Sequence, residues 1–403
     1  MNKLTIWLLI FVASAMALPA AAQESVLYSF NPEADGDPQG RLLLEKGSLF
    51  GTTEGQGGSD GTVYELKPSG TSWKESTIVT FNGTNGAYPA AGLIADSSGN
   101  LYGTTGSAGT YNGGTVFMLS PSRRGWNLQT IWYFGNTTTH DGVAPQCDLL
   151  MDSTGTIYGT TAKGGTNNLG TVFKLALSNG VWTETVLYNF AGGSDGEVPY
   201  AGLTMDSSGS LYGTTYYGGG LGNCNTGCGT AFELKQSGGV WTETVLHAFG
   251  NGRDGQFPGY GPLVLASNGA LYGTTWYGGK DASGTVYELK SSGGKWKETR
   301  IYDFTGGADG ADGNGGLVAD KSGTLYGTTI LGGSHDGGTA YTLAKSGSGW
   351  AESVLYDFDG SSGDGFFPQA GVILDKKSGT LFGVTSQGGT GGWGTVYQIL
   401  LAN

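Results

Sequence analysis

The 403 residues carry a formal net charge of -13, and only 13% of them are charged. A chain this acidic lacks the basic patch that nucleic-acid binding requires, and anionic membrane surfaces repel it, so we expect neither partner. Glycine contributes 78 residues, and because many of them recur at fixed positions they indicate tight turns and not disorder.

Residues 1–22 have the pattern of a secretory signal peptide. Lys3 precedes an apolar run from Leu4 to Leu18, and Ala20-Ala21-Ala22 is a small-residue cleavage site. The run is short for a membrane span, although an uncleaved anchor is the alternative. No second apolar stretch or C-terminal sorting tail follows. We expect an exported protein, secreted or periplasmic, with no membrane span after cleavage and with residues 23–403 as one monomeric domain.

A five-residue motif, Leu-Tyr-Gly-Thr-Thr, occurs seven times with small variations. The copies start at residues 49, 101, 157, 211, 271, 325 and 381. A period of this length indicates one supersecondary unit that repeats until the chain closes or stacks.

The repeat at 201–249 shows the unit most clearly. Short apolar or alternating segments at 201–206, 210–215, 229–234 and 241–249 predict four strands, here called a, b, c and d. Turn residues separate them, as in Asp206-Ser-Ser-Gly209. No segment has a sustained helical period, so the chain is predicted to be all-β.

Seven repeats of four antiparallel strands predict a seven-bladed β-propeller. The first mature segment, 25–30, matches a d strand, and the last, 394–400, matches a c strand. We therefore expect the N-terminal strand to complete the seventh blade and close the ring, because a linear solenoid would need distinct capping repeats. The predicted repeats lie near 39–81, 91–134, 148–190, 201–249, 261–304, 315–358 and 370–401 plus 25–30.

Several conspicuous residues recur in nearly every repeat, which favours an architectural role. The tryptophan that opens strand d is expected to pack between blades, and so is the aromatic residue of strand b. The hydroxyls of the Thr-Thr pair are expected to satisfy backbone groups at the end of strand b.

Functional residues are expected on one face of the ring. The a–b and c–d turns are short, whereas the long and variable loops are all d–a or b–c connections, which emerge together. The d–a loops carry a recurrent Asp-Gly at Asp35, Asp141, Asp195, Asp254, Asp309 and Asp364, with Asn85 in the second copy. A ring of carboxylates could hold Ca²⁺, but Asp-Gly is also ordinary turn chemistry, and we favour the turn and expect no cofactor or metal.

Aromatic residues that do not repeat mark a candidate ligand site on the same face. Rings beside carboxylates suit a sugar, since they stack on its C–H patches while polar groups bond its hydroxyls. The alternative is that the aromatics merely cover glycine-rich loops. The candidate ligand-binding residues are Tyr200, Tyr216, Tyr217, Arg253, Asp254, Phe257, Tyr260, Trp276 and Tyr277.

Signals of catalysis are weak. The three histidines, His140, His247 and His335, lie in different repeats without metal-ligand spacing. No nucleophile elbow is present, and paired carboxylates for glycoside hydrolysis cannot be singled out, although Asp195 and Asp254 are the first candidates.

The three cysteines have no nearby histidine ligand. Export favours a disulfide between Cys224 and Cys228 that closes a short loop, and a metal-binding or redox pair is the less favoured alternative. Cys147 is predicted to be a buried thiol.

The ordered motifs Leu-Tyr-Gly-Thr-Thr-x-x-Gly-Gly, Gly-Thr-Val-Phe, Trp-x-Glu-x-Val-Leu-Tyr-x-Phe and Asp-Gly-x-x-Pro cover nearly the whole mature chain. They resemble the tandem repeat of exported bacterial proteins called choice-of-anchor tandem repeat GloVer-containing proteins. The resemblance implies export and repeat architecture, and no activity. Members often carry a C-terminal sorting anchor, which this sequence does not show.

Three functions therefore stay open. The first is a secreted, non-catalytic propeller that binds an extracellular glycan or another surface ligand on the long-loop face. The second is a polysaccharide lyase or glycoside hydrolase that uses carboxylates of that face. The third is a structural scaffold or a partner of a cell-surface protein.

Overall fold

The computed structural model describes residues 22–31, 36–55, 58–220, 224–250, 253–361 and 363–401. The predicted signal peptide, apart from Ala22, and Asp35 of the first Asp-Gly motif lie outside these ranges. Within them the chain forms strands and loops, and no helical segment is present that could cross a membrane.

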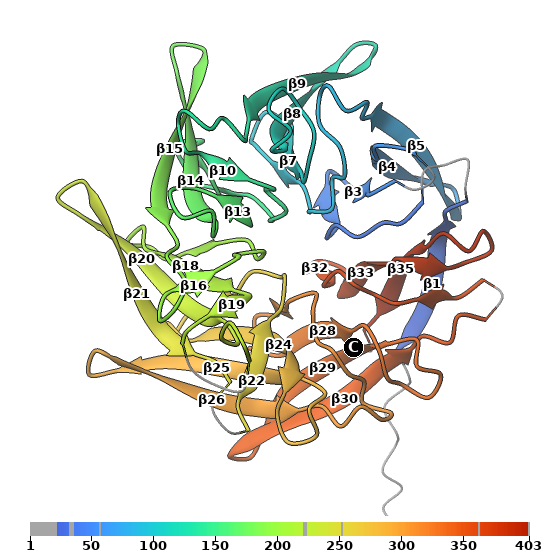
Figure 1. Cartoon of the computed structure of the whole chain (residues 1–403). Coiled ribbons are helices and arrows are strands. Elements are labelled where there is room, and N and C mark those ends of the chain that lie inside the picture. The colour runs from blue at the N-terminus through green and yellow to red at the C-terminus, as the bar shows by residue number, and fades with distance from the viewer. Residues whose placement is uncertain are drawn as a thin grey trace, which may run out of the picture.

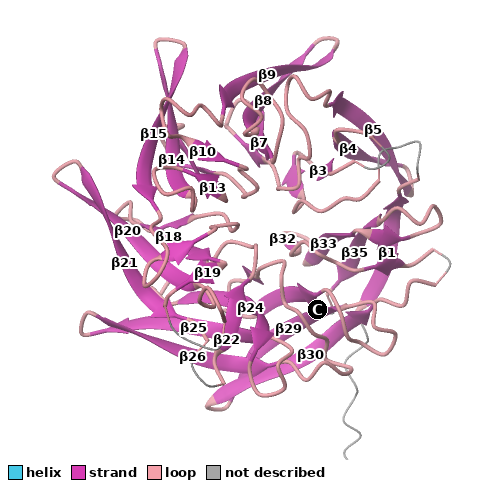
Figure 2. Ribbon diagram, in the orientation of Figure 1, coloured by secondary structure: helices cyan, strands magenta, loops and turns pink. Residues whose placement is uncertain are grey.

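Seven antiparallel sheets, six of four strands and one of five, form a closed ring, a seven-bladed β-propeller (Figure 1). Figure 2 shows that only strands and loops build it. From the axis outward, blades 1 to 3 are β2 (Leu43–Glu45), β3 (Ser48–Thr53), β4 (Thr62–Ser69), β5 (Ser72–Thr80); β6 (Ile94–Ala95), β7 (Leu101–Thr105), β8 (Thr115–Ser122), β9 (Gly125–Tyr133); and β11 (Leu150–Met151), β12 (Ile157–Thr161), β14 (Thr171–Ser178), β15 (Val181–Asn189).

Blades 4 to 6 repeat this order. They are β17 (Thr204–Met205), β18 (Leu211–Thr215), β20 (Thr230–Ser237), β21 (Val240–Ala248); β23 (Val264–Leu265), β24 (Leu271–Gly278), β25 (Thr285–Ser292), β26 (Lys295–Asp303); and β27 (Val318–Ala319), β28 (Leu325–Thr329), β29 (Thr339–Ser346), β30 (Gly349–Asp357).

Blade 7 joins the two ends of the described chain. It consists of β32 (Ile373–Asp375), β33 (Thr380–Thr385), β35 (Thr395–Leu400) and, outermost, the N-terminal β1 (Gln23–Ser29). β1 pairs antiparallel with β35, with Ser25 opposite Gln398. The predicted closure is confirmed, and it covers the edge that β35 would otherwise expose.

The Leu-Tyr-Gly-Thr-Thr motif is strand b, and its glycine and two threonines each have a structural role. In blade 4 a Cβ on Gly213 would lie 2.6 Å from the Phe232 ring of strand c, so only glycine leaves room for that ring. The two threonines of blade 3 bond in different directions. Thr160 donates its hydroxyl to the carbonyl of Ala201 in the next blade, and Thr161 bonds the hydroxyl of Thr171 in strand c. The motif therefore joins strands within a blade and joins blades to each other.

The tryptophans of strand d pack across blade boundaries, as predicted. Trp126 of blade 2 meets Phe50 of blade 1 edge-on with ring centres 5.7 Å apart, and Trp182 of blade 3 meets Tyr102 of blade 2 at 6.2 Å. Each boundary thus buries aromatic surface from two blades, which holds the ring rigid around its axis.

The d–a loops lie against the b–c loops on one face. Short strands in the d–a loops pair with residues that follow strand b: β10 (Gly142–Val143) with β13 (Lys163–Gly164), β16 (Gly196–Glu197) with β19 (Tyr217–Gly218), β22 (Gly255–Pro258) with β24, and β31 (Gly365–Phe366) with β34 (Gln387–Gly388). These pairings fix the long loops on the ring and define one long-loop face.

Candidate functional site

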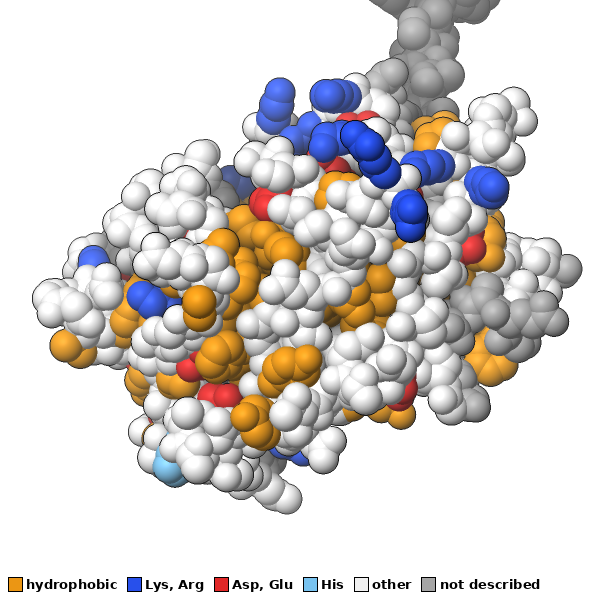
Figure 3. All heavy atoms as spheres, turned by 90° about the horizontal axis from the view of Figure 1, so that it is seen from above, with side chains coloured by type: hydrophobic (Ala, Val, Ile, Leu, Met, Phe, Trp, Pro, Cys, Tyr) orange, Lys and Arg blue, Asp and Glu red, His pale blue; other side chains and the backbone are white. Residues whose placement is uncertain are grey.

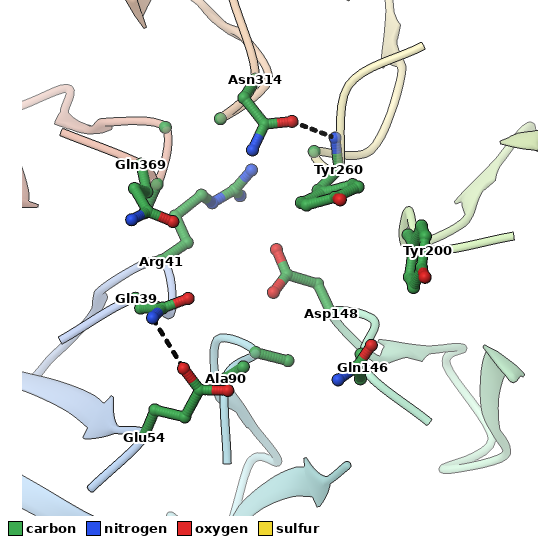
Figure 4. A pocket seen from close by; sticks show the side chains of 15 residues that line it. Gln39, Arg41, Glu54, Ala90, Gln146, Asp148, Tyr200, Tyr260, Asn314 and Gln369 are labelled. Atoms are coloured by element: carbon green, nitrogen blue, oxygen red, sulfur yellow. Dashed lines mark hydrogen bonds between the residues drawn. The ribbon is translucent and has the colours of Figure 1, made fainter. Parts of the chain in front are cut away.

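The axis of the ring opens on the long-loop face in a pocket of about 270 Å³. Each of the seven d–a loops contributes one residue at the same position of the repeat, and in five copies this residue directly follows a proline. The seven, here called the mouth ring, are Gln39, Ala90, Gln146, Tyr200, Tyr260, Asn314 and Gln369, and Figure 4 shows them around the pocket.

Two charged residues also line the pocket, Arg41 and Asp148. They stand two positions after the mouth-ring residue, where the other five copies have glycine or proline. In Figure 4 the Asp148 carboxylate projects into the pocket and the Arg41 side chain extends toward Asn314. Asp148 accepts a hydrogen bond from the Gly92 amide at 2.7 Å. Among the described residues no carboxylate lies within ion-pair distance of Arg41, so its guanidinium is available to a ligand.

A second carboxyl group approaches the pocket from blade 1. Glu54 accepts a hydrogen bond from the Gln39 amide at 2.7 Å. Burial, together with the charge of Asp37, raises the pKa of Glu54. The mouth therefore offers amide donors and acceptors, one guanidinium and two carboxyl groups within a small cavity.

Seven of the predicted binding residues form one continuous aromatic cluster beside this pocket. Tyr216 is its centre: its ring stacks on Phe257 at 4.9 Å between ring centres and contacts Trp276 at 6.0 Å. Tyr200 and Tyr260 meet at 4.9 Å, and both also belong to the mouth ring. The cluster comprises Tyr200, Tyr216, Tyr217, Phe257, Tyr260, Trp276 and Tyr277.

The cluster is only partly covered by the loops. Tyr260 and Tyr277 are 40% and 41% exposed, whereas the central Tyr216 is half-buried. Burial and neighbouring tyrosines raise the pKa of Tyr260 to about 12, so its hydroxyl stays protonated and can donate. Trp276 lies beside the buried carboxyl group of Asp312. Burial raises the pKa of this carboxyl group, and the nearby indole N–H lowers it. The indole N–H makes no hydrogen bond of good geometry. The aromatics thus form a half-open wall that leads into the polar mouth.

Arg253 and Asp254, predicted to belong with the aromatics, have different surroundings. Within the described part of the chain no hydrogen bond or ring contact joins Arg253 to the cluster. Asp254 turns away to the boundary of blades 4 and 5, where its Oδ2 lies 2.7 Å from Nε2 of His247 and its Oδ1 accepts the Gly255 amide at 2.8 Å. The structure thus groups the aromatics and turns the Asp254 carboxylate toward the blade boundary, and ligand binding by Arg253 and Asp254 stays a prediction.

The residues with the best arrangement for a metal are at that same boundary. One ligand atom each from His247, Asp254 and Glu298 lies within 4.8 Å of the others, and this is the one such group in the described residues. Spacing along the sequence conceals it, because Glu298 comes from the following blade. Burial, with the charge of Asp254, raises the pKa of Glu298 to about 7, so near neutrality the carboxyl is partly protonated. Other blade boundaries hold the same Asp and Glu without a histidine.

Asp195, the other carboxylate considered for catalysis, holds its own loop together. It accepts hydrogen bonds from the Tyr188 hydroxyl at 3.0 Å and from the amides of Ala191 and Gly196. These contacts agree with the turn role favoured from the sequence, and calcium binding by the Asp-Gly loops stays the untested alternative.

The cysteines are separate from the mouth. A disulfide joins Cys224 to Cys228 in the b–c loop of blade 4. Cys147 is a buried free thiol whose pKa burial raises to about 11, and its sulfur accepts a hydrogen bond from the Thr160 amide. It packs in the core between blades 2 and 3.

Comparison with known proteins identifies the family of this chain and shows proteins with a similar fold. The family model described as the Gloeobacter/Verrucomicrobia repeat matches residues 16–226 and 221–403. No curated protein matches the sequence. A candidate 6-phosphogluconolactonase from Bacteroides uniformis is 11% identical over 78% of this chain and 83% of its own, with a TM-score of 0.51. A protein from Lactobacillus plantarum is 15% identical over 80% and 85%, also with a TM-score of 0.51. At such identities the likeness concerns the fold alone.

Proposed function

This chain belongs to the Gloeobacter/Verrucomicrobia repeat family, and we propose that it is an exported propeller that binds a glycan at the mouth of its ring without transforming it. One observation supports this most: the aromatic cluster is continuous with the mouth ring, because Tyr200 and Tyr260 belong to both. A sugar has the same two aspects, an apolar C–H face and a rim of hydroxyls.

The chemistry of each side chain suggests which part of the sugar it would contact. Exposed Tyr260 offers a ring face on which a pyranose can stack. The amides of Gln146, Asn314 and Gln369 both donate and accept, which suits hydroxyl groups. Arg41 and Asp148 add a charged donor and acceptor that the other repeats lack, and so they would select one orientation of the sugar.

Binding is favoured over cleavage because the carboxylates considered for catalysis have structural partners. Asp195 bonds Tyr188 and Asp254 bonds His247, each at a blade boundary. The second function, a lyase or hydrolase, would have to use Asp148 and Glu54 at the mouth, and it stays a prediction.

A glycan array probed with the labelled protein tests the proposal. We expect binding to a limited set of glycans, and we expect Tyr260→Ala to abolish it. Tyr111→Ala is the matched control, since Tyr111 is 49% exposed in a loop of blade 2 and belongs to no part of the cluster. Failure of the folded wild-type protein to bind any glycan would remove the proposal and favour a protein partner.

A further inference from the structure

Basic residues gather at the ends of the hairpins between strands c and d, in five of the six blades that have a tryptophan there. Six hairpins have a tryptophan at the start of strand d. The end of each is taken as the eight residues that finish just after this tryptophan, namely 67–74, 120–127, 176–183, 235–242, 290–297 and 344–351. Together these hairpin ends contain nine lysines and arginines and no aspartate or glutamate, in a chain with 33 acidic and 20 basic residues. The nine are Lys67, Lys74, Arg123, Arg124, Lys235, Lys290, Lys295, Lys297 and Lys345.

These nine side chains, here called the cationic crown, are all exposed. Only Lys67 forms an ion pair within the described residues, with Glu65 at 2.9 Å, and Lys345 lies over the Trp350 ring. In the space-filling view, Lys and Arg side chains gather on one side of the molecule (Figure 3). The molecule is acidic overall, but its charges are separated in space. The side with the basic residues can therefore attract an anionic partner, contrary to the expectation from the net charge.

A second feature of the crown is unfavourable for folding. Lys67 stands directly opposite Lys74 in blade 1, and Lys290 stands opposite Lys297 in blade 5. Like charges at opposed positions of antiparallel strands destabilise the pair. The equivalent pair in blade 6 is Ala344 and Ala351, so the repeat accepts neutral residues there. Charge at these hairpins is thus present at a cost in stability, which a function in binding would explain.

We propose that the cationic crown binds a flexible anionic polysaccharide, a chain with repeated carboxylate groups such as a polyuronate. The hairpins radiate outward from the ring in different directions (Figure 1). A flexible polymer can follow the rim from one hairpin to the next, whereas a flat bilayer meets only the tips that lie in one plane. Each hairpin alone gives weak and salt-screened attraction, and a polymer that bridges several of them gains affinity through multivalency.

Nucleic acid has the same charge but suits the crown less well. Binding of single strands draws much of its strength from bases that stack on exposed aromatic rings. The tryptophans of the hairpins are instead packed on the neighbouring blade, as Trp126 is on Phe50 and Trp296 on Tyr212. A polysaccharide with carboxylates needs no such rings. The acidic remainder of the molecule repels the polymer, so the crown would be bound while the mouth stays free.

Titration of the full-length mature protein with polygalacturonate tests the proposal. We expect binding in 50 mM salt that weakens at least tenfold in 200 mM salt, and no binding to neutral dextran. The variant Lys67→Gln, Lys74→Gln, Lys290→Gln, Lys297→Gln should lose at least tenfold in affinity and keep its Tm. The control Lys163→Gln, Lys280→Gln removes two exposed lysines of the long-loop face, away from the crown, and should stay within about twofold of the wild type.

Three outcomes would overturn the proposal: no binding of polygalacturonate in 50 mM salt, equal losses per replaced lysine in the crown variant and the control, or tighter binding to phosphatidylglycerol vesicles or to a single-stranded oligonucleotide than to the polymer. Tyr260→Ala separates this surface from the mouth, because it should leave polygalacturonate binding unchanged.

Discussion

The imidazole Nε2 of His247 lies 2.7 Å from Oδ2 of Asp254. In two other blades a tyrosine hydroxyl occupies the place of the imidazole: Tyr188 donates to Asp195 at 3.0 Å and Tyr302 to Asp309 at 2.9 Å. His247 therefore belongs to a contact that recurs between blades, in which a donor from strand d holds the aspartate of the loop that follows it.

A glutamate of the next blade completes this contact. Glu184, Glu243, Glu298, Glu352 and Glu24 each have a pKa raised from 4.5 to about 7, first by burial and then by the charge of Asp141, Asp195, Asp254, Asp309 and Asp364 respectively. Each of these glutamates is therefore partly protonated near neutrality. At the boundary of blades 1 and 2 all three positions change together, to Val79, Asn85 and Leu128, as expected if the group works as a unit.

These carboxyl pairs predict that the propeller loses stability as the pH rises. A glutamate whose pKa is higher in the folded state than in the unfolded chain contributes its full stability below pH 4.5 and loses it as the pH rises to about 7. Asp152 and Asp206 of the a–b turns act oppositely, since hydrogen bonds lower their pKa below 3.8, and their contribution is lost only in stronger acid. We expect the Tm, measured by calorimetry from pH 3 to pH 8, to be highest near pH 4 to 5.

The control for this profile is the variant Glu184→Gln, Glu243→Gln. Glutamine keeps the shape of the side chain and cannot ionise, so the fall in Tm between pH 5 and pH 7 should become shallower. An unchanged slope would show that these glutamates do not cause the loss of stability between pH 5 and pH 7.

His247→Tyr should be tolerated. The change introduces the residue that blades 3 and 5 use against the same aspartate, and we expect a Tm within a few degrees of the wild type and unchanged glycan binding. If zinc raises the Tm of the wild type, the variant should lose that effect, because the metal-ligand group at this boundary then lacks its imidazole. A collapse of the fold would show that histidine has a role of its own here.

Gly213→Ala tests the account of the repeated motif. The new Cβ would lie 2.6 Å from Phe232 and 2.9 Å from Leu203, so we expect a loss of about 1–3 kcal/mol in the free energy of unfolding. Gly349→Ala is the matched control in an exposed strand, where the nearest atom to the new Cβ is 4.0 Å away. Urea denaturation should separate the two variants, and equal losses would contradict the packing argument.

The sequence was sufficient to predict the fold because its periodic residues are the architectural ones. The motif around Gly213, the tryptophans and the N-terminal d strand lead directly to seven closed blades. The grouping of the aromatics was also predictable, since Tyr216 and Trp276 follow strand b in adjacent copies and so emerge side by side.

Other parts of the site were not predictable from single loops. The mouth ring becomes visible only when the repeats are aligned at the residue before strand a, which identifies Gln146, Asn314 and Gln369, and Arg41 and Asp148 two positions later. The sequence groups Asp254 with the aromatics, whereas its loop directs the carboxylate toward His247 and a glutamate of the next blade. Contacts across a blade boundary depend on the register of two sheets, which no local pattern contains.

The most direct test of the proposed glycan site uses two residues from opposite parts of the mouth, Tyr200 of the aromatic cluster and Gln369 of blade 7. One glycan selected on the array is titrated by calorimetry into the wild type, Tyr200→Ala and Gln369→Ala. If the cluster and the mouth ring form one site, both variants should lose at least tenfold in affinity for that glycan while their Tm values stay close to the wild type. Unchanged affinity in both folded variants would contradict a glycan site at the mouth.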